Sequence, residues 1–133
     1  MGLSTDDVVA IQQLVARYNF AVDGGDPDAF AGTFTPDGEF GAAGNVMRGH
    51  DELRAFVVGR AGIAPRRHLV SSILVDGDGD RASVRACLQV VAMGDDGSFQ
   101  IAVQGTYDDE VVRTADGWRF ARRSFTPDTA PGT

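Results

Sequence analysis

Residues 66–125 read RRHLVSSILVDGDGDRASVRACLQVVAMGDDGSFQIAVQGTYDDEVVRTADGWRFARRSF. Apolar residues alternate with polar ones along most of this stretch, and glycine- and aspartate-rich segments interrupt it at 76–80, 94–97 and 115–117. Such a pattern is typical of consecutive antiparallel strands joined by tight turns. It predicts strands over about 68–75, 82–93, 99–113 and 118–125, of which the third is long enough to be strongly curved.

The residues before this stretch follow a helical period instead. Apolar side chains recur every three or four positions at Val8, Ile11, Val15, Tyr18 and Val22, as on one face of an amphipathic helix. Gly24-Gly25 ends that helix, Asp26-Pro27 starts a short second one, and 49–60 predicts a third. Residues 37–41 predict a short strand. Helices followed by consecutive strands indicate an α+β domain, with helices packed on one face of an antiparallel sheet.

Length and charge limit the functions that need to be considered. The chain has 133 residues, 43% of them apolar, with a net charge of −7, which predicts one domain over 1–126 and a flexible tail over 127–133. The acidic balance argues against nucleic-acid binding. No apolar run approaches the roughly 20 residues of a membrane span, and we expect no signal peptide. The lone Cys87 excludes an intrachain disulfide and suits a reducing cytoplasm.

We predict no metal site. The run Asp76-Gly-Asp78-Gly-Asp80 begins like a calcium-binding EF-hand loop, but Arg81 and Cys87 replace its glycine and its bidentate glutamate. A tight hairpin turn explains the run better. With only two histidines, a three-histidine metal site is impossible.

His68 is the more informative of the two histidines. It opens a strand on which His68, Val70, Ser72 and Leu74 share one face. If that face lies beneath the helices, the imidazole sits at the edge of an apolar cavity, where histidine is the natural proton shuttle near neutral pH. The alternative is a surface or structural histidine. His50 lies at the start of the third helix and is interpreted as a cap-region residue.

Asp109 and the arginine pair at 122–123 each leave two alternatives open. Asp109 is in phase with the apolar positions of its strand, so it is buried or paired, unless a bulge or an early end of the strand leaves it in water. Burial without a partner would raise its pKa. Strict alternation places Arg122 on the side of Trp118 and Phe120, whereas a bulge would place Arg123 there. An arginine facing an apolar cavity would bind an anion or a carbonyl; two solvated surface arginines are the alternative.

Six short motifs share a recognisable order and spacing. They are Arg17-Tyr18 with Asp23-Gly24-Gly25-Asp26, Phe34-Thr35-Pro36-Asp37-Gly38, Gly49-His50-Asp51-Glu52-Leu53, Arg67-His68-Leu69, Gly105-Thr106-Tyr107-Asp108-Asp109 and Asp116-Gly117-Trp118-Arg119-Phe120. Together, over about residues 4–125, they resemble the SnoaL-like branch of the nuclear-transport-factor-two-like superfamily. The resemblance implies a cone-shaped α+β barrel, with three N-terminal helices on a strongly curved antiparallel sheet around an apolar pocket. It also implies a homodimer or homotrimer built on the outer face of the sheet.

The resemblance also implies catalytic roles. Asp23 and His68 match the aspartate and histidine of scytalone dehydratase-like enzymes, and Tyr18 matches a tyrosine of bile acid 7α-dehydratase-like enzymes. In such a site the histidine abstracts a proton, the carboxylate orients it, and the phenol polarises an oxygen. Asp23 lies about 140° around an ideal helix from Tyr18, so both side chains can reach one pocket only if the helix frays or bends before Gly24. Tyr107, Asp109, Arg122 and Arg123 are the candidate substrate-binding residues, with Arg123 slightly favoured over Arg122.

Three differences from the related enzymes reduce the number of reactions that the site residues could support. Residues 91–93 offer no second histidine or acid, Ala42 stands near the position of the ketosteroid isomerase base, and arginines replace the last-strand aspartate of epoxide hydrolases. The predicted function is therefore a cofactor-independent lyase or isomerase, such as a dehydratase or cyclase, acting on a small apolar, oxygenated metabolite of polyketide, steroid or terpenoid type. The alternative is a non-catalytic ligand-binding or accessory subunit.

Overall fold

The computed structural model describes residues 2–129, which form three helices and six strands. In chain order these elements are α1 (Thr5–Asp23), α2 (Pro27–Ala31), β1 (Phe34–Ala42), β2 (Asn45–Arg48), α3 (Gly49–Val58), β3 (Arg66–Asp78), β4 (Arg81–Met93), β5 (Phe99–Thr114) and β6 (Gly117–Pro127). The predicted α+β class and all predicted helices and strands are confirmed. The four-residue strand β2 was not predicted.

Local capping explains where the first two helices begin. The Ser4 hydroxyl accepts a hydrogen bond from the Asp7 N–H, and the Asp7 carboxylate accepts one from the Ser4 N–H, a reciprocal capping box. The Asp26 side chain caps α2 by accepting from the Ala29 N–H, and Pro27 follows at the first helical position, where no N–H is needed. These caps fix the entry of both helices toward the sheet.

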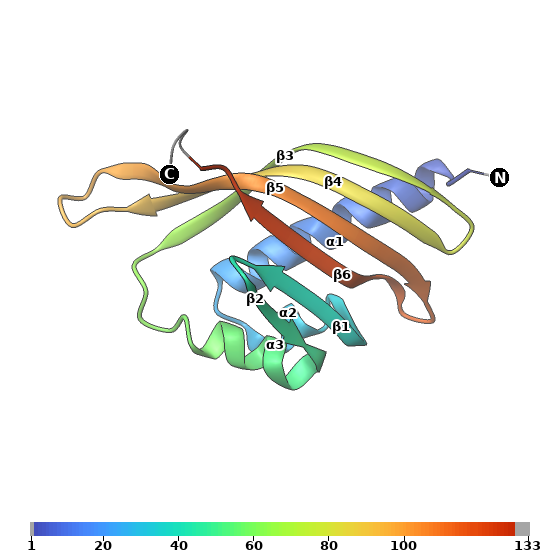
Figure 1. Cartoon of the computed structure of the whole chain (residues 1–133), viewed down its shortest axis with the longest axis horizontal. Coiled ribbons are helices and arrows are strands. Elements are labelled where there is room, and N and C mark those ends of the chain that lie inside the picture. The colour runs from blue at the N-terminus through green and yellow to red at the C-terminus, as the bar shows by residue number, and fades with distance from the viewer. Residues whose placement is uncertain (1, 130–133) are drawn as a thin grey trace.

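The strands form one sheet in the order β2-β1-β6-β5-β4-β3. Neighbouring strands pair antiparallel, except that β1 and β6 pair parallel. The sheet is therefore mixed, which local sequence patterns did not predict. It curves strongly without closing, because β2 and β3 remain as its two edges. Figure 1 shows α1 lying along one face of the sheet, with α2 and α3 grouped near β1 and β2.

Three single-residue irregularities reverse the alternation of side chains. In β3 the register shifts between Ser71 and Leu74, around Ser72 with φ +53°, so Leu74 turns outward and is 66% exposed. The predicted shared face of His68 and Leu74 was therefore wrong. In β5 the extra residue is Ala102, and in β6 it is Ala121. Each is a β-bulge, which adds one residue to one strand and sharpens the local twist.

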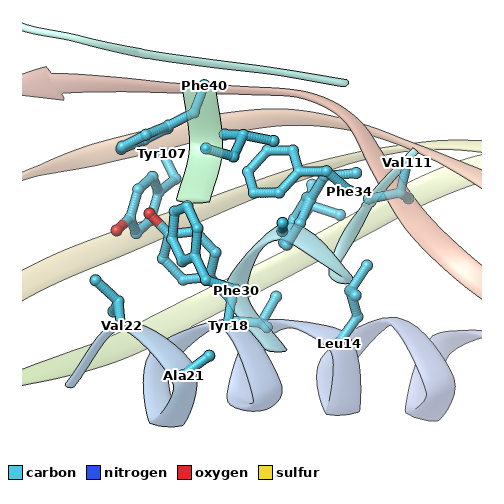
Figure 2. Packing of buried hydrophobic residues seen from close by; sticks show 14 of the residues in the cluster. Leu14, Tyr18, Ala21, Val22, Phe30, Phe34, Phe40, Tyr107 and Val111 are labelled. Atoms are coloured by element: carbon cyan, nitrogen blue, oxygen red, sulfur yellow. The ribbon is translucent and has the colours of Figure 1, made fainter. Parts of the chain in front are cut away.

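The core between the helices and the sheet is rich in aromatic side chains. Figure 2 shows how rings from α1, α2, β1 and β5 gather in one cluster. Within it the Tyr18 ring lies 5.0 Å from that of Phe30 and 6.1 Å from that of Tyr107, centroid to centroid. Tilted and edge-to-face pairs at these distances are the favourable arrangement of aromatic rings. The cluster supports the inner end of the cavity described below.

The first residues of the C-terminal segment, Pro127 and Asp128, continue the sheet. Pro127 is the last residue of β6, and the Asp128 N–H donates to the Gln104 carbonyl at 2.8 Å. Residues 130–133 of the expected flexible tail lie outside the described residues. Among the helices of the described part, none is long and apolar enough to span a membrane.

Candidate active site

Asp23 and His68 form a two-point hydrogen-bonded pair. The Asp23 Oδ1 lies 2.6 Å from the His68 ring Nδ1, and its Oδ2 accepts from the His68 backbone N–H at 2.9 Å. The carboxylate at the end of α1 thus holds both the ring and the main chain of the first residues of β3. Both side chains are largely buried, with 10% of His68 and 17% of Asp23 exposed.

The helix does not need to fray for this pair to form. α1 stays helical through Asp23 and ends at Gly24, whose N–H donates to the Phe20 carbonyl. Asp23 reaches sideways to the edge strand β3, whereas Tyr18 points into the core. The two side chains therefore point from different faces of the helix, and the pair forms although α1 does not fray before Gly24.

The carboxylate determines the state of the imidazole. Because a carboxylate only accepts hydrogen bonds, Nδ1 must carry the proton that it shares with Asp23. In the neutral ring this leaves Nε2 unprotonated and able to accept a proton. Burial lowers the pKa of His68 below its ordinary 6.5, and the positive charges of Arg60 and Arg123 act in the same direction, while Asp23 opposes them. The ring is therefore neutral at pH 7, which is the form a general base requires.

His68 lines an apolar cavity of about 420 Å³ between the helices and the concave face of the sheet. The cavity walls are mainly aromatic and aliphatic. They comprise Tyr18, Val22, Phe40, Ala42, Ala43, Asn45, Phe56, Arg60, Arg66, His68, Leu88, Val90, Val103, Tyr107, Phe125 and Pro127. A cavity of this size and composition suits a small, mostly apolar molecule.

Two tyrosine hydroxyls belong to the same cavity. Tyr18 and Tyr107 share a hydrogen bond, and Figure 2 shows both hydroxyl oxygens at one edge of the aromatic cluster. Burial raises the pKa of both phenols, and the bond between them raises that of Tyr18 further while it lowers that of Tyr107. A phenol can both donate and accept a hydrogen bond, so either hydroxyl can also donate to a molecule in the cavity that both tyrosines line.

Behind the tyrosines lies a buried ion pair. Arg123 Nε donates to Asp109 Oδ1 at 3.1 Å, and both side chains are fully buried. The guanidinium carbon lies 3.4 Å from the ring centre of Tyr107 and 4.2 Å from that of Tyr18, so the charge is stabilised by aromatic faces. Burial raises the pKa of Asp109 to about 6, against the effect of Arg123. The bulge at Ala121 is what places Arg123 inside and leaves Arg122 exposed on the outer face.

The structure thus divides the predicted site residues into three groups. Tyr18, Tyr107 and His68 line the cavity, with Asp23 bound to His68. Asp109 and Arg123 lie behind the tyrosine rings and do not line it, and Arg122 is on the opposite face. The other histidine, His50, lies in the first turn of α3 with its Nε2 3.0 Å from the Phe34 carbonyl oxygen.

Several cavity residues were not predicted from the sequence. Arg66 stands two residues before His68 on the same face of β3, so alternation could have identified it. Arg60 follows α3 in a loop, where no periodic pattern marks it. Among residues 2–129 no group of three or more histidine, cysteine, aspartate or glutamate side chains could hold a metal ion.

The NTF2-like superfamily has this architecture. A curved, open sheet carries helices over its concave face, with an apolar cavity between them and a histidine and an aspartate at the cavity edge. The sequence profile of the SnoaL-like domain matches residues 4–124, and the chain belongs to that family.

Solved structures support this assignment. A protein of unknown function from Mycobacterium tuberculosis is 33% identical, with a TM-score of 0.89 over 93% of this chain and 73% of its own. An NTF2-like protein from Novosphingobium aromaticivorans is 26% identical, with a TM-score of 0.86 over 96% and 84%. A candidate aromatic ring hydroxylase from the same organism is 32% identical, with a TM-score of 0.83 over 96% and 93%.

Proposed function

We propose that the protein is a cofactor-independent lyase or isomerase in which His68 moves a proton on an apolar, oxygenated molecule held in the cavity. The observation that carries this proposal is the 2.6 Å contact between Asp23 Oδ1 and His68 Nδ1, made by a histidine that also lines the cavity. The contact supports an orienting role for Asp23 and the base role for His68.

The proposed step begins with a carbon–hydrogen bond next to a carbonyl group. His68 Nε2 takes the proton, and the electron pair of that bond moves into the carbonyl to form an enolate. The enolate oxygen accepts a hydrogen bond from a hydroxyl of the Tyr18–Tyr107 pair. The imidazolium, stabilised by Asp23, then returns its proton, either to a leaving oxygen that departs as water or to another carbon. The first outcome is dehydration and the second is isomerisation.

In this proposal Asp109 and Arg123 position the tyrosines and do not contact the substrate, because the aromatic rings separate them from the cavity. The guanidinium against the faces of Tyr18 and Tyr107 restricts both rings. Arg122 has no role at this site, since its side chain is on the opposite face of the sheet.

A second function has one observation in its favour. Asp23 also accepts from the main-chain N–H of His68, so the pair ties the end of α1 to the edge strand β3. A contact with that structural purpose would be found in a ligand-binding or accessory subunit without turnover. The experiment must therefore detect proton transfer and not merely binding.

Hydrogen–deuterium exchange provides such an experiment. We would incubate the protein with 2-tetralone in D₂O and follow loss of the proton signal next to the ketone by NMR. The wild type should accelerate exchange over buffer, and His68→Ala should remove roughly 10²- to 10⁴-fold of that rate. His50→Ala is the matched control, because it deletes the other imidazole, which does not line the cavity. Exchange that is equally fast in His68→Ala and the wild type would leave the binding function as the better account.

The outer face of the sheet supports a proposal about assembly. Large apolar side chains on β3 and β5 face outward, with Phe99 73% and Ile101 56% exposed. We propose that two or three copies associate through this face, since contiguous exposed apolar surface marks an interaction site. We also propose that the protein is cytoplasmic, where its exposed thiol Cys87 would stay reduced. Because the helices and the sheet share one core, we propose that they form a single domain.

A further inference from the structure

The cavity that His68 faces carries an unusual charge for this chain. The protein has 19 acidic and 12 basic residues other than histidine, yet the cavity is lined by two arginines and, among the described residues, by no aspartate or glutamate. Both arginines, Arg60 and Arg66, also line the adjoining groove beneath the loop between α3 and β3. Asp23 borders that groove, but both of its oxygens are already bonded to His68.

Neither arginine has an anionic partner among residues 2–129. The buried Nε of Arg66 has no hydrogen-bond acceptor in the described chain, and a buried N–H without an acceptor is costly. Arg60 makes its recognisable contact with the cavity residue Phe56, whose ring centre lies 5.4 Å from the guanidinium carbon. Arg67, which also has no carboxylate partner in the described chain, is exposed instead. These two half-buried guanidinium groups are therefore available to a ligand.

We propose that Arg60 and Arg66 bind a carboxylate of the substrate, so that the cavity accepts an apolar carbonyl compound that carries an acidic group. This inference rests on the proposed function, because it uses the same cavity. The planar guanidinium matches a carboxylate with two parallel hydrogen bonds. Arg66 and His68 are two residues apart on one face of β3, which separates them by about 7 Å. The acidic group thus lies about one fused ring away from the carbon that loses its proton.

A pair of matched ligands tests this site. Isothermal titration calorimetry would compare 2-naphthoic acid with 2-naphthalenemethanol, which have the same ring system with and without the carboxylate. We expect the wild type to bind the acid roughly 10- to 100-fold more tightly, as for hydrogen bonds to a charged group. Arg66→Gln and Arg60→Gln should each reduce that preference about tenfold, and Arg66→Lys should retain part of it.

Arg67→Gln is the matched control. It removes the same charge from the adjacent residue, whose exposed side chain is outside the cavity lining, and should leave the preference unchanged. Equal binding of acid and alcohol by the wild type would overturn the inference, as would an equal loss in Arg67→Gln and Arg66→Gln. If Arg66→Gln fails to fold, Arg60→Gln provides the same test. Because 2-tetralone is uncharged, the deuterium-exchange test of His68 does not depend on the arginines, and its outcome is independent of the binding preference measured here.

Discussion

Asp23→Asn should impair His68 because it changes which ring nitrogen carries the proton. In the wild type, Asp23 accepts from the His68 backbone N–H at 2.9 Å and from Nδ1 at 2.6 Å. An asparagine has one accepting oxygen and one donating NH₂ group. If its oxygen keeps the backbone N–H, the NH₂ group faces Nδ1, which must then be unprotonated. The proton moves to Nε2, and the nitrogen toward the substrate can no longer accept one.

The size of the effect follows from the same two contacts. Turning the amide around would restore the ring tautomer, but it would set NH₂ against the largely buried backbone N–H, at a cost of about 1–3 kcal/mol. The active tautomer therefore falls by roughly 10- to 100-fold. Losing the charged hydrogen bond that stabilises the imidazolium removes about 1.5–3 kcal/mol more. The combined loss of exchange rate should be roughly 10²- to 10⁴-fold, with little change in binding.

Two measurements check this reasoning. Proton–nitrogen correlation NMR of the imidazole reports the tautomer, and deuterium exchange of 2-tetralone reports the rate. The control is Asp108→Asn, the same acid-to-amide change at an exposed position paired with Arg85, which should alter neither. A variant Asp23→Asn that keeps the proton on Nδ1, or loses less than about threefold in rate, would refute the argument.

Three further predictions concern pH, stability and assembly. Because the pKa of His68 lies below 6.5, the deuterium-exchange rate should be constant above about pH 7 and should fall in acid. Arg60→Gln removes a positive charge near His68, so the rate should begin to fall at a higher pH. Measuring the exchange rate as a function of pH tests both expectations. Arg123→Met leaves Asp109 buried without its cation and should cost about 3–5 kcal/mol in urea unfolding near pH 8. The folded-state pKa of Asp109 is already raised and would rise further in this variant, so its protonation stabilises the folded state in acid and this stabilisation is lost as pH rises. The loss of unfolding free energy in Arg123→Met should therefore be smaller near pH 5 than near pH 8. An equal loss at both pH values would contradict this. Ile101→Arg on the outer face should lower the mass measured by light scattering to that of one chain, and an unchanged oligomer would locate the interface elsewhere.

Much of the fold could be predicted because it depends on local periods. The spacing of apolar residues identified α1, and alternation between glycine-rich turns identified the long strands. β2 was missed because its four residues, Asn45–Arg48, are too few to show alternation. The parallel pairing of β1 with β6 is a relation between distant segments, which no local pattern encodes.

The bulges mark the limit of reading side-chain faces from sequence. One inserted residue reverses every later position on a strand, and whether it forms depends on the partner strand. Leu74 was therefore assigned to the wrong face. For Arg122 and Arg123 the two phases could be stated in advance, but only the bulge at Ala121 decides between them. The approach of Asp23 to His68 came from resemblance to known enzymes, because no local rule joins residues 45 positions apart.

The pairing of β1 with β6 has a consequence for biosynthesis. The ribosome releases Phe34 long before Phe120, the β6 residue that pairs with it and packs against its ring. Until then the nascent chain exposes aromatic surface that the cell must protect from aggregation. The slow step of folding should be the pairing of these two strands, because the chain must lose the entropy of closing a long loop before the favourable contacts form. We expect chains that stop before residue 117 to remain unfolded on the ribosome and to depend on chaperones.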